Sequence, residues 1–500
     1  MPIRLLFLII SVLLLAGIYL WSLIWPGALA FYALLIPLVI LGLVDMLQKK
    51  KAVIRNFPVI GHLRYLMEAI RPELQQYFVE SNLDGRPINR ETRSIVYQRA
   101  KGELQTLPFG TQRNVYEVGY EWVGHSLYPK KVDPQSLRVT IGNAQCQKPY
   151  NASVFNISAM SFGSLSYNAI LALNGGAKKG AFYHNTGEGG LSPHHLGPGG
   201  DIVWQVGTGY FGCRDDDGKF HADKFAQKAQ GENIKMIELK LSQGAKPAHG
   251  GILPKAKITA EIAAIRGVGM EKDVNSPPGH SAFEGPVGMM QFVAKLRELS
   301  GGKPVGLKIC VGLKAEFIEL CEAMKATGVF PDFITVDGGE GGTGAAPLEF
   351  SNNVGMPLRE GLQLVHKVLR QQGLREQTKL IASGKVITAF NMVTTLALGA
   401  DTINCARGMM LALGCIQALR CNTNKCPTGV ATNDPYLVAG LDPDDKAERV
   451  YRYHRDSLKA FAEIVGAMGL AHSSEIKPHH IFHRISETEV KTYAELYGSP

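Results

Sequence analysis

The chain has 500 residues, including 55 glycines, and a formal net charge of +9 at pH 7. This length exceeds the usual single domain, although α/β barrels run past about 250 residues as one unit, so a large buried core is feasible. Lysine and arginine are scattered, without a basic helix or an aromatic-interleaved patch, which argues against nucleic-acid binding. We attribute the positive charge to a membrane-proximal segment and to anionic ligands.

The N-terminal segment is the longest apolar run in the chain. No charged side chain occurs between Arg4 and Asp45, and the run is broken only at Trp25-Pro26-Gly27. Each of the two resulting stretches, of about twenty residues, is long enough to cross a bilayer as a helix. We therefore predict a transmembrane hairpin within residues 1–50, with spans at about 5–25 and 27–44.

Basic residues follow the second apolar stretch at Lys49, Lys50, Lys51 and Arg55. Such a flank is typical of the cytoplasmic side, so both ends of the hairpin and the catalytic domain are expected to be cytoplasmic. The alternative is a cleaved secretory signal with its cleavage site at Ala28-Leu29-Ala30. The length of the first stretch, and the second stretch directly after it, favour a membrane anchor.

The pattern changes twice after the hairpin. Residues 51–150 are mixed, and we expect a docking segment there. Beyond Asn151, short apolar runs alternate with helical segments, which is typical of a parallel sheet built from βα units. Eight candidate strands begin at Val154, Ala181, Ile202, Ile234, Val305, Phe333, Lys379 and Thr402.

Eight strands over this span predict an α/β fold, a (β/α)8 TIM barrel at 151–435. A helical extension is expected at 436–500. An open doubly wound sheet is the alternative. Glycine and polar residues follow most of the strands, at the carboxyl edge where barrel enzymes place their chemistry, and this favours the closed barrel.

One strand end needs separate treatment, because Gly339–Gly344 satisfies the pattern G-x-G-x-x-G. A dinucleotide-binding fold would open a helix at once and place an acidic residue about twenty positions later. Pro347 follows instead. We interpret the segment as a barrel loop that approaches a cofactor ring or phosphate, and we do not expect NAD(P)H to bind this chain.

Three cysteines cluster at Cys415, Cys421 and Cys426. A disulfide is not expected in a cytoplasmic domain, so closely spaced thiols indicate a metal. The spacing lacks the paired knuckles of common zinc sites, and no histidine lies nearby. A proline after the last cysteine is typical of iron–sulfur loops. An iron–sulfur cluster is favoured, with zinc and inert buried thiols as alternatives.

Several motifs resemble, in order, those of the FMN-dependent glutamate synthase family. They are SAMSFGSLS (158–166), HNTGEGGL (184–191), IELKLSQGAKPAHGGILP (237–254), DGGEGGTGAAP (337–347) and GCIQALRC (414–421). The resemblance covers 153–435. It implies an FMN-binding barrel and a [3Fe–4S] cluster on Cys415, Cys421 and Cys426 in the loop 413–431.

The resemblance also implies which residues contact the flavin. The loop after the first strand covers the ring, and positively charged and glycine-rich positions follow later strands. The FMN phosphate is expected to bind at the loops after the last two strands, which is the usual phosphate position of a barrel. Lys308 and Arg407 have an alternative interpretation as partners of acidic neighbours. The implied FMN contacts are Met160, Ser161, Gly163, Gln243, Lys308, Gly341, Gly342, Thr343, Ser383, Gly384, Arg407 and Gly408.

The family's substrate, 2-oxoglutarate, is a dianion that needs cations for its carboxylates. Lys246 and Arg266 stand at the family's positions, and Glu188 matches the carboxylate beside the reacting centre. This chain departs from the family at His249 and Ile252, which replace a glutamate and a polar substrate contact. The identity of the 2-oxo acid is therefore left open.

The predicted activity is FMN-dependent reductive amination of a 2-oxo acid, with ammonia forming glutamate from 2-oxoglutarate. We expect ferredoxin or a separate reductase subunit to supply electrons, which reach the flavin through the cluster. No amidotransferase domain is expected in this chain, so nitrogen would come from free ammonia or a separate amidotransferase. Two alternatives are a different CH–NH substrate, such as an N-alkylated amino acid, and a non-catalytic membrane electron-transfer subunit.

Overall fold

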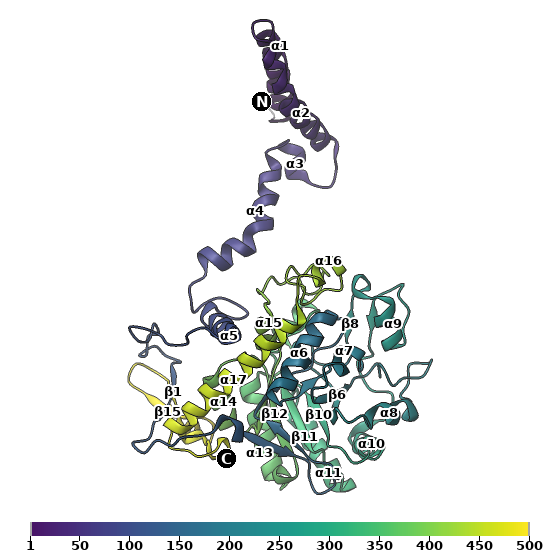
Figure 1. Cartoon of the computed structure of the whole chain (residues 1–500), viewed down its shortest axis with the longest axis vertical. Helices are drawn as coiled ribbons and strands as arrows, with labels where there is room; N and C mark the ends of the chain where they lie inside the picture. The colour runs from purple at the N-terminus through teal and green to yellow at the C-terminus, as the bar shows by residue number, and fades with distance from the viewer. Residues whose placement is uncertain (1–2, 499–500) are drawn as a thin grey trace. The chain divides into compact units, whose positions relative to one another are not determined.

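The computed structural model describes residues 3–498 and separates into two units, Met1–Arg90 and Glu91–Pro500. The mixed segment expected at 51–150 is divided by this boundary. Its first part belongs to the N-terminal unit, whose helices are coloured purple in Figure 1, and the remainder belongs to the barrel unit.

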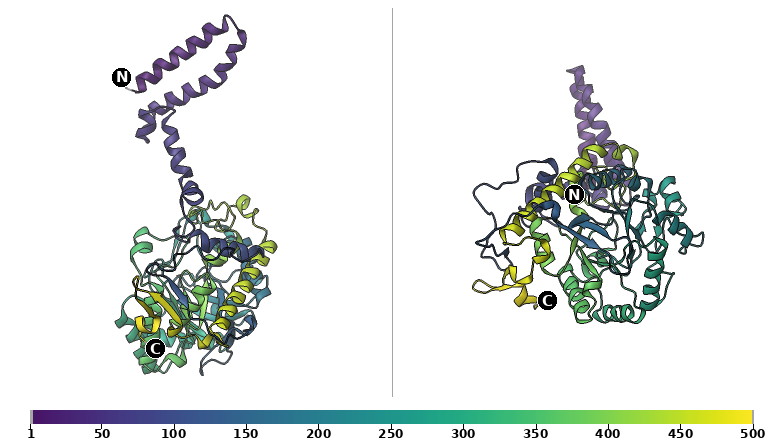
Figure 2. Two further views of the ribbon diagram at one scale, coloured as in Figure 1. Left: turned by 90° about the vertical axis from the view of Figure 1, so that its left-hand side faces the viewer. Right: turned by 60° about the horizontal axis from the view of Figure 1, so that its bottom comes forward.

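The N-terminal unit begins with an antiparallel helical hairpin (Figure 2). The Tyr32 hydroxyl donates a hydrogen bond of 2.8 Å to the Leu15 carbonyl, and the Trp21 ring stacks on Phe31 at 5.5 Å. The chain reverses just before Pro26, which suits the first position of a helix because it lacks an N–H group. The unit consists of α1 (Ile3–Ser22), η1 (Pro26–Phe31), α2 (Tyr32–Leu47), α3 (Ala52–Asn56), α4 (Gly61–Leu74) and η2 (Gln75–Val79).

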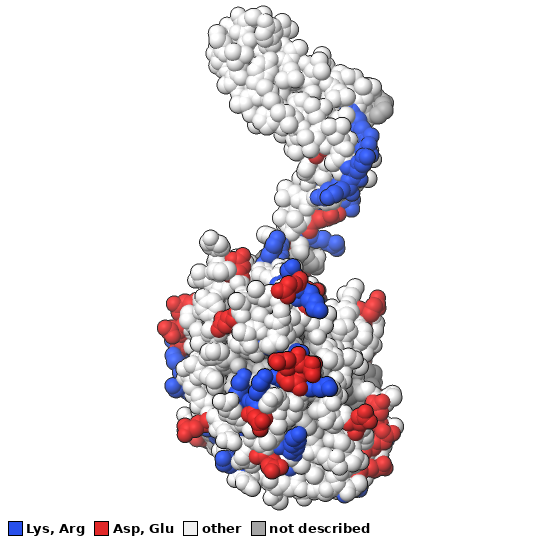
Figure 3. Space-filling model, turned by 90° about the vertical axis from the view of Figure 1, so that its right-hand side faces the viewer, with Lys and Arg blue, Asp and Glu red and all other residues white. Residues whose placement is uncertain are grey.

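Two segments of this unit, Ile3–Ser22 and Pro26–Leu47, are long and apolar enough to cross a membrane, and nearly all of their surface is exposed. Figure 3 shows this apolar surface in white, with lysine and arginine gathered where it ends. The Arg4 guanidinium donates to the Arg55 carbonyl at 2.8 Å. Asp45, at the end of α2, is buried and accepts from His62 at 2.8 Å.

In the second unit, eight parallel strands close into a barrel, as predicted (Figure 1). The last strand pairs with the first through Ile403 and Phe155, so no open edge remains, and the alternative of an open sheet is wrong. All eight predicted strands are present; the second is the buried polar pair His184–Asn185, and the other seven carry buried apolar residues. They are β4 (Phe155–Ile157), β5 (His184–Asn185), β6 (Ile202–Val206), β7 (Ile234–Lys240), β10 (Val305–Ile309), β11 (Phe333–Asp337), β12 (Lys379–Ser383) and β13 (Thr402–Cys405).

Helices follow the strands in turn and cover the outside of the barrel. The principal ones are α6 (Tyr167–Gly180), α7 (Pro193–Leu196), α8 (Ala222–Ala229), α10 (Gly285–Leu299), α11 (Lys314–Thr327), α13 (Leu358–Gln371), α14 (Ala389–Ala397) and α15 (Arg407–Leu413). The connection after β7 carries β8 (Ile252–Leu253), η4 (Lys255–Lys257), α9 (Ala260–Arg266) and β9 (Val274–Asn275), and the connections around α13 carry α12 (Leu348–Asn353) and η5 (Arg375–Gln377).

A hairpin formed by β2 (Arg138–Ile141) and β3 (Tyr150–Ser153) closes the amino end of the barrel. Its apolar side chains join a buried cluster with residues at the starts of the strands, among them Tyr183, Met236 and Phe333. Loops at the opposite, carboxyl end are therefore the ones available for chemistry.

The C-terminal extension is only partly helical. Its long helix α17 (Pro443–Ala467) packs along α6, and Asp442 caps it by accepting from two backbone N–H groups. The expectation of a helical extension at 436–500 is corrected by two short strands, the first of which pairs with β1 and the second with the first. Glu121 of β1 also binds Arg359, His483 and Tyr493. The remaining elements are β1 (Glu121–Val123), η3 (Pro134–Ser136), α5 (Arg90–Lys101), α16 (Pro435–Val438), η6 (Ser473–Glu475), η7 (Pro478–His480), β14 (Ile481–Arg484), β15 (Val490–Thr492) and α18 (Tyr493–Tyr497).

Candidate active site at the carboxyl end of the barrel

Two loops at the carboxyl end of the barrel lie directly against each other. The loop after β4 carries Met160 and Ser161, and Met160 donates its N–H to the Asn185 carbonyl at 3.1 Å. A Cβ atom at Gly187, whose φ is +64°, would lie 2.9 Å from the Ser161 nitrogen. Glycine is required there because the backbones approach closely in a left-handed conformation.

Glu188 extends from the second loop toward the end of β7. Lys240 donates to its Oε1 at 2.6 Å and to Gln243 Oε1 at 2.6 Å. Burial by itself would raise the pKa of Glu188, but the charge and hydrogen bond of Lys240, with Lys246 and Arg266 farther away, outweigh burial and lower it. Glu188 is therefore an ionised carboxylate in a mostly buried position.

Lys240 was not among the predicted site residues. The signal for it was present, because a charged residue at the carboxyl end of a barrel strand is a candidate functional group. His280 was also missed; its ring lies 3.0 Å from the Tyr210 hydroxyl and 2.8 Å from the Lys240 carbonyl. Its neighbourhood could not be read from the sequence because β7 lies 40 residues away.

The two predicted substrate cations, Lys246 and Arg266, are 3% and 4% exposed. The Lys246 ammonium makes no hydrogen bond or ion pair within residues 3–498, and burial lowers its pKa to about 8. Arg266 donates to the Phe162 carbonyl at 3.1 Å, while its Nε is buried without a partner among the described residues. Burial lowers the pKa of Arg266 to about 10.

Buried cations are costly unless anions compensate them. Around Lys246 and Arg266 the compensation comes from one carboxylate, Glu188, which Lys240 already occupies. An incoming ligand with more than one negative charge would meet both unsatisfied cations. The arrangement thus fits a dianionic ligand.

The Glu188 carboxylate lies directly against the backbone of Gly251. A Cβ atom at Gly251 would lie 2.6 Å from Glu188 Oε1 and 2.9 Å from Ser276 Oγ. The Ser276 hydroxyl is itself buried, and no described residue is its hydrogen-bond partner. A buried polar atom left unpaired costs about 1–3 kcal/mol, so this hydroxyl is a further point where a polar ligand would be held.

A second group of charges lies where β10 and β11 end. The Lys308 ammonium and the Asp337 carboxylate form a buried ion pair at 3.5 Å, and Asp337 also accepts from the Gly244 N–H at 2.8 Å. Lys308 is thus paired with an acidic neighbour, which was the alternative to a free flavin contact. Ser383 Oγ lies 3.4 Å from Ser158 Oγ, which brings the end of β12 to the same place.

Arg407 and the glycine-rich loop after β11 form the candidate phosphate region. The Arg407 guanidinium donates to the Glu340 carbonyl at 2.6 Å, and burial lowers the pKa of Arg407. A Cβ atom at Gly342 would lie 2.9 Å from Arg407 Nε, so the loop and the arginine are in direct contact. Gly341 lies beside Asp337, and Gly384 adopts φ +148° directly after β12.

Two of the predicted flavin contacts are not brought into this group. Thr343 is exposed, and its hydroxyl bonds only within its own loop, to the Ala345 carbonyl at 3.2 Å. Gly408 faces the barrel exterior, because a Cβ atom there would lie 2.5 Å from the Tyr453 hydroxyl of α17. Packing against α17 explains this glycine without a ligand.

The three clustered cysteines lie in the irregular segment between α15 and α16. Burial first, and then the neighbouring thiols, raise the pKa of Cys415 to about 11, so the three sulfurs are electrostatic neighbours. Gln417 has a positive φ of 58°, uncommon for a non-glycine residue. Among the described residues, no three His, Cys, Asp or Glu side chains are arranged to hold one metal ion.

Cys426 has the environment of a thiolate. Burial alone would raise its pKa, but the Thr428 hydroxyl, at 3.4 Å, and nearby backbone N–H groups lower it. Hydrogen bonds to a thiolate are typical of iron–sulfur ligands. The surroundings of Cys426 therefore favour the thiolate, the form of cysteine that binds metals.

Lys257 and Asn433 tie the cysteine loop to the loop after β4. The buried Lys257 ammonium donates to the carbonyls of Ser164 and Cys421, the latter at 3.3 Å. The Asn433 amide donates to the Gly163 and Lys257 carbonyls, both at 2.8 Å. The candidate flavin loop and the candidate cluster loop are thus held together through two side chains.

Comparison with known proteins identifies the family of this chain. The family model described as the conserved region in glutamate synthase matches residues 124–471. The chain is 38% identical over 493 residues to the glutamate synthase large subunit-like protein YerD of Bacillus subtilis (strain 168), covering 90% of this chain and 93% of that protein. It is 35% identical to the archaeal glutamate synthase [NADPH] of Methanocaldococcus jannaschii, covering 71% of this chain and 66% of that protein.

Among solved structures, the chain resembles the recombinant flavin-binding domain of baker's yeast flavocytochrome b2. The TM-score is 0.43 and the identity 12%, with 78% of each chain covered. The family is established by the sequence matches, which span most of the barrel unit. The chain belongs to the family defined by the conserved region of glutamate synthase.

Proposed function

We propose that this protein is an FMN-dependent oxidoreductase that reductively aminates a 2-oxo acid, with 2-oxoglutarate as the favoured substrate. One observation carries the proposal: the buried cations Lys246 and Arg266 lie beside the ionised carboxylate of Glu188 at the carboxyl end of the barrel. A substrate with two carboxylates supplies the negative charge that this group of side chains lacks.

FMN would be held by the loop after β4, by Lys308, and by the Gly342–Arg407 region. Support comes from the close packing at Gly342 and from the buried Arg407, whose fork-shaped guanidinium suits a phosphate. When bound, FMN supplies the hydride that reduces the substrate.

The chain's own residues bind and orient the substrate. Lys246, with a pKa of about 8, is mostly protonated at neutral pH and would bind one carboxylate, while Arg266 would bind the other. Ammonia and the 2-oxo acid lose water to form an imine. Glu188, kept ionised by Lys240, would stabilise the positive charge of the protonated imine.

Cys415, Cys421 and Cys426 would hold the [3Fe–4S] cluster through which electrons arrive. The contacts of Lys257 and Asn433 support this role, because they hold the cysteine loop against the candidate flavin loop. The donor would be ferredoxin or a separate reductase subunit. The M. jannaschii relative is named as NADPH-dependent, which favours the reductase.

The apolar hairpin would anchor the enzyme in a membrane, with the barrel in the cytoplasm. Its two exposed apolar helices and the basic residues Lys49, Lys50, Lys51 and Arg55 support this placement. Nitrogen would reach the site as ammonia, either free or released by a separate amidotransferase.

The test is anaerobic purification followed by visible and electron-paramagnetic resonance spectra, and then by reoxidation. We expect flavin absorption, an iron–sulfur signal, and reoxidation of the reduced enzyme by 2-oxoglutarate with ammonia, with formation of glutamate. Colourless protein would contradict the cofactors. Reduced protein that is not reoxidised would contradict the substrate.

A second candidate keeps the cofactors and changes the substrate to another CH–NH compound, such as an N-alkylated amino acid. It is favoured by His249, whose ring lies 5.3 Å from that of Phe350, and by Ile252, since these residues replace a glutamate and a polar substrate contact of the family. Reoxidation of reduced enzyme by a panel of 2-oxo acids and amines, monitored by stopped flow, separates the two candidates.

A further inference from the structure

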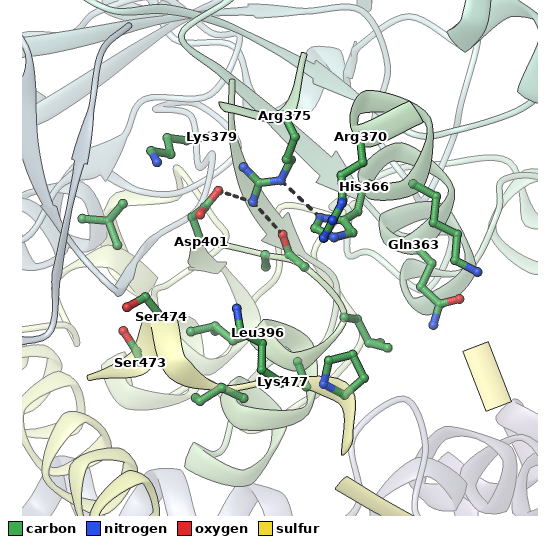
Figure 4. A pocket seen from close by; sticks show the side chains of 18 of the residues that line it. Gln363, His366, Arg370, Arg375, Lys379, Leu396, Asp401, Ser473, Ser474 and Lys477 are labelled. Carbon is green, nitrogen blue, oxygen red and sulfur yellow. Dashed lines mark hydrogen bonds and ion pairs between the residues drawn. The ribbon is translucent and has the colours of Figure 1, made fainter. Parts of the chain in front are cut away.

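A cavity of about 290 Å³ lies at the amino end of the barrel, away from the candidate active site (Figure 4). Its walls come from α13, the first residue of β12, the turn before β13, and the C-terminal extension. Lys379 begins β12 and lines the cavity, whereas Ser383 ends the same strand at the candidate flavin site. The two sites are thus at opposite ends of one strand.

The lining of the cavity is strongly cationic. Among the described residues that line it, Asp401 is the single carboxylate, and Glu376 borders an adjoining outer part. The lysines and arginines of the lining are Arg138, Lys367, Arg370, Arg375, Lys379 and Lys477.

The one carboxylate among these lining residues is already neutralised by structural contacts. Arg375 donates to Asp401 Oδ2 at 2.7 Å and to the Thr378 and Gly399 carbonyls at 3.0 Å. The Leu380 N–H also donates to Asp401 Oδ2 at 2.7 Å. Arg375 and Asp401 therefore hold the starts of β12 and β13 in place and leave the other cations uncompensated.

Three of those cations have no protein partner within residues 3–498. The side chains of Arg370, Lys379 and Lys477 make no hydrogen bond or ion pair with any residue in the described part of the chain. Figure 4 shows them around the Arg375–Asp401 pair. Side chains of this kind, placed around one hollow, produce a local positive potential that attracts anions.

The same positive potential acts on His366. Arg375 Nε donates to His366 Nδ1 at 3.2 Å, so the imidazole accepts there and is neutral. Burial first, and then the charges of Arg375, Arg370 and Lys477, lower the pKa of His366 to about 4. At neutral pH the ring adds no charge, and it offers a flat, half-buried surface beside the cations.

The inner wall of the cavity is apolar. It is formed by Leu396 and Ala397 at the buried end of α14, by Leu398 directly after it, and by Ile476 and Pro478 of the C-terminal extension. A ligand that fills the cavity therefore needs a charged end for the lysines and arginines and an uncharged, partly apolar body for this wall.

We propose that this cavity binds a small molecule in which one or more phosphate groups are attached to an apolar or aromatic body, the chemistry of a nucleotide. The unpartnered Arg370, Lys379 and Lys477 of the described chain would contact the phosphates, because guanidinium and ammonium groups are the strongest phosphate donors in proteins. The body would lie against Leu396 and Ile476. The volume is near the lower end of the range of about 300–1,000 Å³ for small-molecule sites.

The probe is ADP, titrated into the full-length protein in detergent by isothermal calorimetry, with no catalytic substrate present. We expect binding at about millimolar concentration or tighter, weakened at least about tenfold in the double variant Arg370→Gln/Lys477→Gln, because that variant removes two charged donors to the phosphates. The matched control is Lys459→Gln, since Lys459 is an exposed lysine of α17 outside the cavity.

Absence of ADP binding to the wild-type protein, or equal binding by the double variant and the control, would overturn the proposal. Adenosine and pyrophosphate separate the two parts of the ligand. We expect adenosine to bind far more weakly than ADP; equal affinity would overturn the role of the cations. Pyrophosphate binding as tightly as ADP would overturn the role of the apolar wall. Far-ultraviolet circular dichroism confirms that the variants are folded.

Discussion

Both ends of the barrel gather cations, but they differ in how those cations are compensated. At the carboxyl end the cations are buried: Lys240 and Lys308 each have a carboxylate partner, Glu188 or Asp337, whereas Lys246 has none within residues 3–498. At the amino end, Arg370 and Lys477 are exposed and have none within residues 3–498.

The difference follows from the cost of desolvation. A buried ammonium must be paired or must lose some of its basicity, as the lowered pKa of Lys246 shows. An exposed cation is hydrated by water, so it can remain without a protein partner at little cost in folding free energy. The carboxyl end is therefore preorganised for one substrate charge pattern, whereas the amino end can bind an anion or remain hydrated.

The largest effect of a substitution is expected for a buried ion pair that stabilises the amino end of the barrel. Arg297 and Asp332 form a pair that is 9% and 0% exposed, with a distance of 3.0 Å. Replacing Arg297 by Met leaves the buried Asp332 carboxylate with backbone N–H donors but without a cation, so the free energy of unfolding should fall by about 3–5 kcal/mol. Urea denaturation followed by circular dichroism measures the change.

The control for this variant is Arg370→Gln at the same end. Because Arg370 is exposed and has no protein partner in the described chain, its replacement should change the free energy of unfolding by less than about 0.5 kcal/mol. Equal loss of stability in both variants would mean that the amino-end cations are not divided into structural and free groups.

The second effect concerns substrate binding at the carboxyl end. In Lys246→Met and Arg266→Met we expect kcat/KM for 2-oxoglutarate to fall by about a hundredfold to a thousandfold, because each loses a buried contact to a substrate carboxylate. Steady-state amination with a chemical reductant gives the rates, and flavin absorption should be unchanged. Retention of full activity by either variant would remove that residue from the substrate site.

A smaller effect is expected at the link between the candidate flavin loop and the candidate cluster loop. Lys257→Met removes the donor to Ser164 and Cys421, and we expect about a tenfold to hundredfold loss of cluster affinity, typical of groups that support metal ligands. Iron content and the electron-paramagnetic resonance spectrum are the measurements. Lys257→Arg keeps a cationic donor and should restore part of the signal; a normal spectrum in Lys257→Met would show that the link is dispensable.

The smallest effect is on pH dependence. Lys246 is protonated below its pKa of about 8 and loses its charge as the pH rises above that value, while Arg266, at about 10, stays charged. Binding of 2-oxoglutarate should therefore weaken above about pH 8 by up to about tenfold per pH unit. Flavin-monitored titrations from about pH 7 to about 9 follow this change. Lys246→Met should show no such dependence between these values.

Much of the architecture could be predicted because it depends on local patterns. The eight strands were found as short apolar runs, and the closed barrel followed from their number. The strands of the C-terminal extension were missed, because segments such as Val490–Thr492 are short and polar and become strands only by pairing with β14.

For the candidate site, the sequence predicted several of the residues but not the contacts between them. Glu188, Lys246 and Arg266 were identified by resemblance and lie near one another in the structure. Lys240 was missed although its place at the carboxyl end of a strand was a signal, and Lys257 was missed because its partner Cys421 lies 164 residues away.

The amino-acid sequence by itself determined the apolar hairpin, the barrel and the cysteine spacing. Each of these is a repeat or a run of similar residues, so it can be recognised from neighbouring positions in the sequence. Only the tertiary structure decided which cations are paired and which are free. The reason is physical, because pairing and burial depend on the distance between side chains in space. Closure of the barrel sets these distances, and they cannot be calculated from the separation of residues along the sequence.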